Sequence, residues 1–502
     1  MATVTTAATA REERWAGSWR SWQRILIAVL GVAFVTIRVW NLTTFCLDSD
    51  EIFSLLSARF GIGGLLHAVR VDVVHPPLSY LVLWIWIRIG GESLLWMRLL
   101  PFTLSIASLV PIGIIFRQLR LNAGAIIIAL FLLTISDYQV FHARYVRMYA
   151  LLFLLSLVSV AIFNAYLKGV TGKRAILLSA VNLLLVYTHY YGWMVVAVEG
   201  LYLLIFERAK LKPFFLGSVC IALLFAPWAI AAADAAAAKG GLTSNLGWIR
   251  HPKIGDLWWY YAGCDGPLWP IPVASAIVFL LFGATAAGLW RVFRAEKNPV
   301  QLTRLRFTLM LAVIPPVVTY LISNMMRNSV WGNRHLIVST VPYLCLLGSA
   351  LIELRPRSVR LFFLSVVAIW GMWGAYRVTL QPDPRNNMDV LTGQLVELNS
   401  RLGSPSSRAL YLLDPYLSFP MRYFLESHYH QPWQLIDAPS PSAIPADRAW
   451  VAYNHKTWRG SKTPQELFRN LGYRIGPGIW AADRWDRIAI FLIYKPESGL
   501  NF

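Results

Sequence analysis

The sequence predicts a mainly α-helical protein that crosses a membrane about 11–13 times and ends in a small α/β domain outside it. Three observations lead to this prediction. Of the 502 residues, 57% are hydrophobic and only 14% are charged, with a mean hydropathy of +0.51. Apolar runs of membrane-spanning length recur between residues 25 and 380. From residue 381 onward the composition changes to that of a soluble domain.

The net charge of +20 is better explained by membrane topology than by binding to nucleic acid. Lys and Arg lie in short clusters between the apolar runs, and they do not gather on one polar face or arm. Cytoplasmic connections of membrane proteins carry such an excess of basic residues. We therefore expect a membrane partner and no nucleic acid.

The first apolar run follows a basic segment and shows no small-residue cleavage site, so we expect an uncleaved first span and a cytoplasmic N-terminus at 1–24. The run 78–90 is ambiguous, because a helix of about thirteen residues reaches only about 20 Å across a core of about 30 Å. If this run lies in the outer interface, every basic cluster is cytoplasmic and 43–96 is the first external loop. The predicted spans of the transmembrane domain 25–380 are 25–42, 97–116, 121–137, 148–167, 174–188, 190–206, 213–232, 271–291, 306–323, 334–352 and 360–379.

Residues 381–502 are predicted to form a soluble extracytoplasmic α/β domain. One helix start in it is well marked, because Thr463 to Glu466 supplies an N-cap threonine, a first-turn proline and a capping-box glutamate. Gly472 is expected to end that helix. Short β-type runs alternate with helical segments, at 408–414, 450–454 and 488–495.

Three carboxylates follow the first predicted span within a few residues. Asp48 and Glu51 lie three positions apart and fit a capping box at the start of an interfacial helix. Such a helix start gives no role to Asp50. Asp50 is therefore the first candidate for chemistry, and Glu51 is a second one that could also hold the acceptor or a metal.

Asp72 and His75 lie three positions apart, ahead of two prolines. They could form a hydrogen-bonded pair or offer two metal ligands. The alternative is a loop fixed by the prolines, in which His75 is a satisfied polar residue. A metal site would need further ligands that the sequence does not identify.

Arg144 and Arg147 lie one helical turn apart at a predicted external end, close to Tyr149. A planar guanidinium donates paired hydrogen bonds, which suits phosphate. Snorkelling arginines are the alternative, but the charge rule expects those on the cytoplasmic side. The external position therefore favours phosphate binding. Further polar candidates lie at two other predicted external ends and are Tyr187, His189, Arg334 and His335.

The order of these motifs resembles the GT-C superfamily of membrane glycosyltransferases. The similarity is strongest to the branch related to dolichyl-phosphate-mannose protein mannosyltransferases and the lipid A aminoarabinose transferase, and it covers about residues 20–380. One departure is Tyr145, where many relatives carry an acid two residues before an arginine. The matching motifs are Asp50-Glu51, His75 to Leu78, Met97 to Pro101, Arg147 to Leu152, 187–190 and Arg334 to Leu336.

This resemblance implies a GT-C fold and a mannosyltransferase-like enzyme of the cell envelope that uses a polyprenyl-phosphate-linked sugar donor. Asp50 would then act as general base on an acceptor hydroxyl of a lipid, glycan or protein, and the single displacement would invert the anomeric configuration. Arg147 and Arg334, with Arg144 and His189, would stabilise the leaving phosphate. The uncleaved first span fits a bacterial cytoplasmic membrane, with the active site and the C-terminal domain extracytoplasmic.

This chemistry requires no metal, although a divalent cation near Glu51, Asp72 or His75 stays open. Two other functions also stay open. A transporter or flippase for a lipid-linked saccharide would place ionisable groups near mid-membrane and show repeated halves, and a polymerase or ligase predicts a large external loop between late helices. The residues left for substrate contact or for such a cation are Asp48, Asp72, His75, Tyr149, Tyr187 and His335.

Overall fold

The computed structural model divides the chain into two compact units. Unit 1 comprises Met1–Leu42 and Ser57–Gln381, and unit 2 comprises Thr43–Leu56 and Pro382–Phe502. Most of the predicted cytoplasmic segment, 1–18, lies outside the described residues. The described residues are 19–238, 249–265, 272–380, 388–402, 408–414, 417–438, 440–444, 447–455, 457–458, 460–482 and 487–496.

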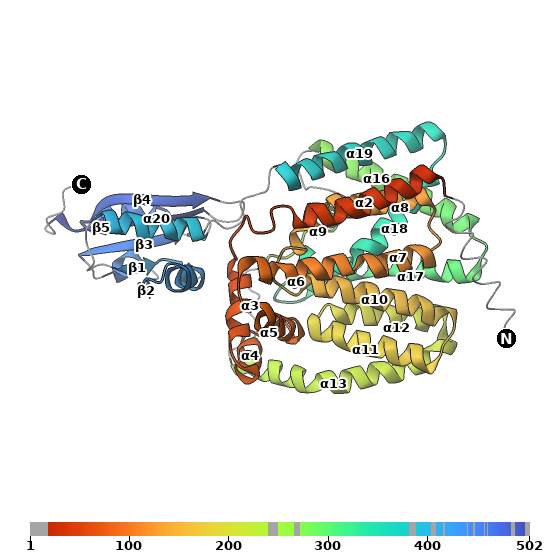
Figure 1. The fold of residues 1–502 in the computed structure, drawn as a ribbon, viewed down its shortest axis with the longest axis horizontal. Helices are drawn as coiled ribbons and strands as arrows, with labels where there is room; N and C mark the ends of the chain where they lie inside the picture. Colours follow the sequence, from red (N-terminus) through yellow and green to blue (C-terminus); the bar gives the residue numbers. More distant parts are fainter. Residues whose placement is uncertain are drawn as a thin grey trace. The chain divides into compact units, whose positions relative to one another are not determined.

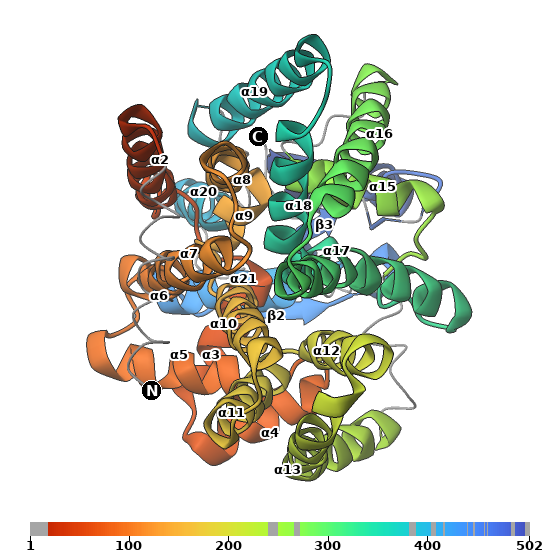
Figure 2. The same ribbon diagram turned by 90° about the vertical axis from the view of Figure 1, so that its right-hand side faces the viewer.

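Unit 1 consists of helices, and its long helices run side by side (Figure 1). Its helical segments are α2 (Ser21–Val39), α4 (Ile62–Asp72), α5 (Leu78–Gly90), α6 (Leu94–Ala107), α7 (Leu109–Gln118), α8 (Ala123–Ile135), α9 (Asp137–His142), α10 (Tyr149–Lys168), α11 (Gly172–Thr188), α12 (Gly192–Phe206), η1 (Arg208–Lys210), α13 (Leu211–Ala238), α15 (Ile254–Asp265), α16 (Pro272–Ala295), α17 (Pro299–Met325), η2 (Asn333–Ser339), α18 (Thr340–Ile352) and α19 (Arg357–Leu380). The helix α3 (Ser49–Arg59) begins in unit 2. In the view along the helices, α10 lies inside the bundle and contacts α6, α7, α11, α12 and α17 (Figure 2).

Each predicted span coincides with one helix of unit 1 or with two consecutive ones. The ambiguous run 78–90 forms α5 with the same bounds, and α5, α8 and α12 are apolar but short. The protein is a multi-pass membrane protein, since six helical segments in the described part of the chain are long and apolar enough to cross a membrane. They are Ser21–Val39, Leu94–Gln118, Tyr149–Lys168, Arg208–Ala238, Pro299–Met325 and Asn333–Ile352.

A buried arginine joins three helices of unit 1. Arg38 on α2 is 1% exposed, and its guanidinium donates to Ser105 Oγ at 3.1 Å and to the backbone oxygen of Leu133 at 3.0 Å. These acceptors belong to α6 and α8. A guanidinium among apolar helices is stable only with such acceptors, so Arg38 has a structural role.

A carboxyl group is buried where α10, α11 and α12 meet. Glu199 is 0% exposed, its Oε2 accepts from Asn182 Nδ2 at 2.7 Å, and its Oε1 lies 2.7 Å from Ser159 Oγ. Ser159 Oγ also lies 2.6 Å from Asn182 Oδ1. One hydroxyl proton serves only one of these two contacts, so the other needs a proton from Glu199. All three hydrogen bonds therefore form only with a neutral carboxylic acid.

Glu199→Gln is expected to unfold thermally in detergent at nearly the wild-type temperature. The glutamine oxygen accepts from Asn182 and its amide donates to Ser159, as the neutral acid does. Glu199→Ala is expected to lower the free energy of unfolding by about 1–3 kcal/mol for each buried group left without a partner. If Glu199→Gln unfolds as early as Glu199→Ala, the hydrogen bonds are not the source of the stability.

Unit 2 is built on a five-stranded mixed sheet with the order β2-β1-β3-β5-β4. β1 pairs in parallel with β2 and β3, whereas β5 pairs in antiparallel fashion with β3 and β4. Its core includes Tyr453, Phe468 and Phe491. The strands are β1 (Ala409–Leu412), β2 (Gln434–Asp437), β3 (Arg448–Asn454), β4 (Arg474–Ala482) and β5 (Arg487–Tyr494), and the helices are α20 (Met388–Arg401), α21 (Ser418–Arg422), η4 (Tyr423–His428), η5 (Pro441–Ala443) and α22 (Pro464–Asn470).

The marked helix start in unit 2 is confirmed. Thr463 caps α22 and forms a capping box with Glu466, and Gly472 follows the helix with a φ of +86°. The three predicted β-type runs coincide with β1, β3 and β5, whereas β2 and β4 were not predicted. Gly476 and Gly478 hide the strand pattern of β4, and its pairing with β5 is irregular there.

The segment Thr43–Leu56, which follows the first span, belongs to unit 2. The rings of Phe53 and Phe419 lie 6.4 Å apart between centroids. Cys46 is a buried cysteine that contacts Asp389 at the start of α20. This segment therefore packs against residues more than three hundred positions later in the chain.

Candidate functional site

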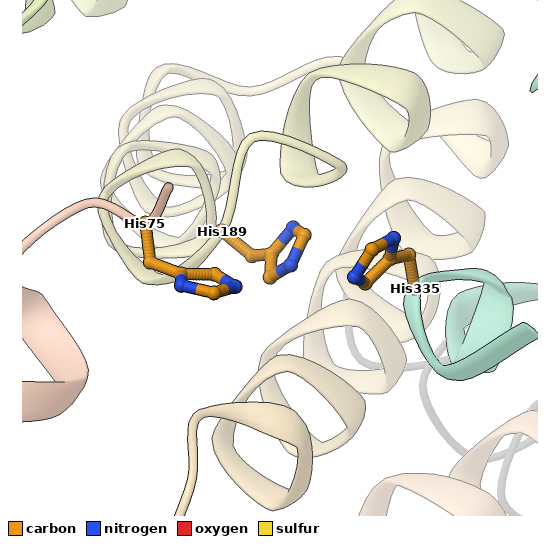
Figure 3. A group of neighbouring side chains, drawn as sticks. All are labelled: His75, His189 and His335. Carbon is orange, nitrogen blue, oxygen red and sulfur yellow. The ribbon is translucent and has the colours of Figure 1, made fainter. Parts of the chain in front are cut away.

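Three histidines from distant parts of the sequence meet in unit 1. His75 follows α4, His189 follows α11 and His335 lies in η2. Nitrogen atoms of the three rings lie within 4.8 Å of one another, and the ring centroids are 5.2 Å apart for His75 and His189 and 4.9 Å apart for His189 and His335. The rings lie in a row with His189 in the middle (Figure 3). We call these residues the three-histidine cluster.

Prolines and a tight helix end fix the backbone around His75. Asp72 is the last residue of α4, and Val73 ends the helix with a φ of 66°. Pro76 and Pro77 then restrict the chain ahead of α5. His75 is held between these two helix ends and is only 3% exposed.

Two tyrosines and a glycine hold the turn that carries His189. Tyr190 Oη donates to the backbone oxygen of Val73 at 3.2 Å, and Tyr191 Oη donates to that of Val330 at 2.6 Å. These bonds fasten the turn to the segments that precede the other two histidines. A Cβ atom on Gly192 would lie 2.6 Å from a backbone oxygen of α11, so only glycine fits there.

Arg147 lies next to the three-histidine cluster. Its Nη1 donates to Tyr80 Oη at 3.1 Å, and its Nη2 lies 3.3 Å from His75 Nδ1. The guanidinium is thereby oriented from two sides. Such an oriented fork of N–H groups suits an oxyanion.

Tyr149 connects a second arginine to the cluster. Its side chain is fully buried, and its ring centroid lies 6.3 Å from those of His189 and His335. The guanidinium carbon of Arg334 lies 6.0 Å from the same tyrosine ring. The structure therefore brings six of the sequence-based candidates together in unit 1, namely His75, His189, His335, Arg147, Tyr149 and Arg334.

Burial and positive neighbours keep the histidines of the helix connections neutral. Burial, with Arg147 and His189 nearby, holds the pKa of His75 well below its usual range. Burial beside Arg334 and Arg147 lowers the pKa of His189 to about 3. Both imidazoles are therefore uncharged at neutral pH.

Two other candidates contact groups outside this cluster. Arg144 donates through Nε to the backbone oxygen of Arg38 at 3.1 Å and through Nη2 to that of Ile37. It satisfies the free carbonyl groups at the end of α2. Tyr187 Oη donates to the backbone oxygen of Leu224 on α13 at 2.7 Å.

The three acids belong to unit 2, and the predicted capping box is confirmed. Asp48 Oδ1 accepts from the Glu51 N–H group at 2.9 Å, and Glu51 Oε2 accepts from the Asp48 N–H group at 3.1 Å. Glu51 is 2% exposed. Asp50 is half-buried in the first turn of α3, where its backbone oxygen accepts from Ser54 Oγ at 3.0 Å. The capping box is therefore formed by Asp48 and Glu51, and the side chain of Asp50 is not part of it.

Comparison with solved structures gives the fold. ArnT from Cupriavidus metallidurans in the apo state matches with a TM-score of 0.54 at 14% sequence identity, over 94% of this chain and 97% of that one. The chain has the fold of ArnT. The ArnT structure bound to undecaprenyl phosphate matches with a TM-score of 0.55 at 13% identity, over 94% of this chain and 98% of that one. No protein-family model and no curated protein sequence matches the chain.

The match to ArnT confirms the predicted GT-C fold, and its coverage extends over both the helical unit and the C-terminal sheet. Reasoning from sequence missed two side chains near the cluster. Tyr80 accepts a hydrogen bond from Arg147, and the ring of His142 lies 4.6 Å from that of Tyr149. The available signal was a tyrosine in the first turn of the apolar helix α5, and a histidine at the end of α9.

Proposed function

We propose that the protein transfers a sugar from a polyprenyl-phosphate donor to an acceptor hydroxyl, with inversion of the anomeric configuration. The observation that carries the proposal is the group of Arg147, Arg334 and buried histidines in one part of unit 1. N–H groups in a site with little water stabilise a leaving phosphate strongly. The fold supports the same proposal, since one ArnT structure is bound to undecaprenyl phosphate.

The proposed reaction is a single displacement. The acceptor oxygen bonds to the anomeric carbon while the bond from that carbon to the donor phosphate breaks. Asp50 takes the proton of the acceptor hydroxyl, and Arg147 and Arg334 stabilise the phosphate that leaves. Glu51 and Asp48 hold the first helical turn that carries Asp50.

We also propose that the protein lies in a bacterial cytoplasmic membrane with the site on the outer face. The basic clusters between the helices support this orientation. A polyprenyl-phosphate donor is itself anchored in the membrane, so a site at the helix ends suits it. The acceptor class is a lipid, a glycan or a protein.

Two buried ionisable groups favour an enzyme over a transporter. Arg38 and Glu199 lie among the helices, and both form hydrogen bonds to neighbouring helices. A transporter keeps such groups for its ion or substrate. Here they connect helices.

The test is transfer of labelled sugar by the purified protein. Polyprenyl phosphates that carry different radiolabelled sugars are offered with lipid, glycan and peptide acceptors. We expect labelled product from at least one donor, with the opposite anomeric configuration to the donor. Saccharide movement across vesicle membranes, without product from any donor, would overturn the proposal.

A further inference from the structure

The three-histidine cluster has the spacing of a metal site. Three imidazole nitrogens within 4.8 Å of one another could hold a zinc-like cation with one open position. The same nitrogens could also donate hydrogen bonds to an anion. The two alternatives require different protons on the rings, so the contacts of each ring decide between them.

His189 presents an N–H group at its Nε2 atom. Its Nδ1 accepts a hydrogen bond from the backbone N–H group of Tyr191 at 3.1 Å. A neutral imidazole that accepts at Nδ1 carries its proton on Nε2. Among the described residues, the buried Nε2 has no hydrogen-bond partner, so it is a donor that lacks an acceptor.

His75 also carries its proton on Nε2. Its Nδ1 lies 3.3 Å from Arg147 Nη2, and a guanidinium can only donate. The proton of the neutral ring is therefore on Nε2. A metal-bound histidine does the reverse, because its second nitrogen donates to a carbonyl or carboxylate oxygen. In both histidines the second nitrogen faces a donor.

Charge favours an anion as well. Three neutral imidazoles leave the full charge of a divalent cation uncompensated, beside the guanidinium groups of Arg147 and Arg334. An oxyanion instead meets two positive groups and two N–H donors in a buried setting.

We infer that the three-histidine cluster binds a phosphate group through the Nε2–H groups of His75 and His189, beside Arg147 and Arg334, and does not bind a metal. The inference rests on the proposed function, in which this part of unit 1 takes the donor phosphate. The chemistry is shared by a polyprenyl phosphate headgroup and by free phosphate. His335 closes the row next to His189. It donates to the backbone oxygen of Val330, so its other ring nitrogen is an acceptor and the phosphate donors are His75 and His189 only.

Two variants of His189 separate a donor at Nε2 from one at Nδ1. His189→Gln puts its amide near the Nε2 position, whereas His189→Asn puts its amide near Nδ1. The dissociation constants of undecaprenyl phosphate and of inorganic phosphate are measured on the purified full-length protein. We expect His189→Gln to stay within a few fold of wild type and His189→Asn to bind undecaprenyl phosphate about 10- to 100-fold more weakly.

Each outcome of the binding measurements either supports or overturns the inference. A loss in His189→Asn for both probes, or for undecaprenyl phosphate alone, supports the inference, and the second case assigns the site to the lipid headgroup. Equal binding by both variants, or equal loss in both, overturns it. Sugar transfer is measured separately, so phosphate binding without transfer would contradict the proposed function and leave the inference standing.

A measurement on wild type keeps the test valid if the variants fold poorly. Co²⁺ is titrated into protein treated with a chelator, and the visible absorption of tetrahedral cobalt is recorded. We expect no such band, and we expect chelator treatment to leave undecaprenyl phosphate binding unchanged. A stoichiometric tetrahedral band would overturn the inference.

Discussion

Asp50→Asn is expected to fold like the wild type and to transfer sugar about 10²- to 10⁴-fold more slowly. The amide keeps the shape of the carboxylate but cannot accept the proton of the acceptor hydroxyl. The hydrogen bonds of the capping box come from Asp48 and Glu51, so the helix start keeps them. The initial rate at saturating donor and the thermal unfolding midpoint are measured on the same preparation.

Asp48→Asn and Glu51→Gln are the matched controls, because each removes one negative charge from the same helical turn. Asparagine caps a helix about as well as aspartate, and glutamine keeps an oxygen for the N–H group of Asp48. We expect both controls to transfer sugar within about tenfold of the wild-type rate, since neither takes the proton. Equal losses in all three variants, or full activity of Asp50→Asn, would remove Asp50 from the role of base.

The helices of unit 1 and two helix starts of unit 2 could be predicted from sequence, because membrane-spanning length and capping are local properties of the chain. The run 78–90 became α5 with the same bounds, although its length had made it ambiguous as a span. The capping boxes at Asp48 and Thr463 were also predicted, because each depends on side chains only three positions apart.

The three-histidine cluster could not be assembled from sequence, because His75, His189 and His335 come from three different connections. The sequence predicted them, as donor-phosphate, substrate or metal candidates, around one external cavity at the helix ends, but it did not predict that the three rings lie next to one another. The contacts of Tyr149 and Arg147 with these histidines depend on how α10 packs within the bundle. Sequence spacing carries no information on that packing.

Segment 43–56 and strand β4 are two further features that could not be predicted from sequence. The segment packs with the C-terminal residues, and pairing across so long a stretch of chain leaves no local signal. Strand β4 contains Gly476 and Gly478, which are typical of loops, and it is held by its neighbour β5 instead of by its own propensity.

Arg147→Lys is expected to slow sugar transfer by about 10²- to 10³-fold, the usual cost of removing one oriented donor from a developing anion. Lysine cannot donate to Tyr80 and reach His75 at the same time, as the fork of Arg147 does. The affinity for undecaprenyl phosphate and the transfer rate are measured together on the purified protein, and we expect both to fall.

Arg144→Lys is the control that separates this role from a general need for basic residues at the membrane surface. Arg144 lies three positions before Arg147, but its guanidinium donates to backbone oxygens at the end of α2. Its replacement is expected to lower the free energy of unfolding by about 1–2 kcal/mol, with the transfer rate per folded molecule near that of wild type. An equal loss of phosphate affinity in both variants would mean that positive charge in this segment matters and the orientation of Arg147 does not. A loss of phosphate affinity confined to Arg147→Lys would show that the oriented guanidinium of Arg147 is needed, because both variants keep the same charge.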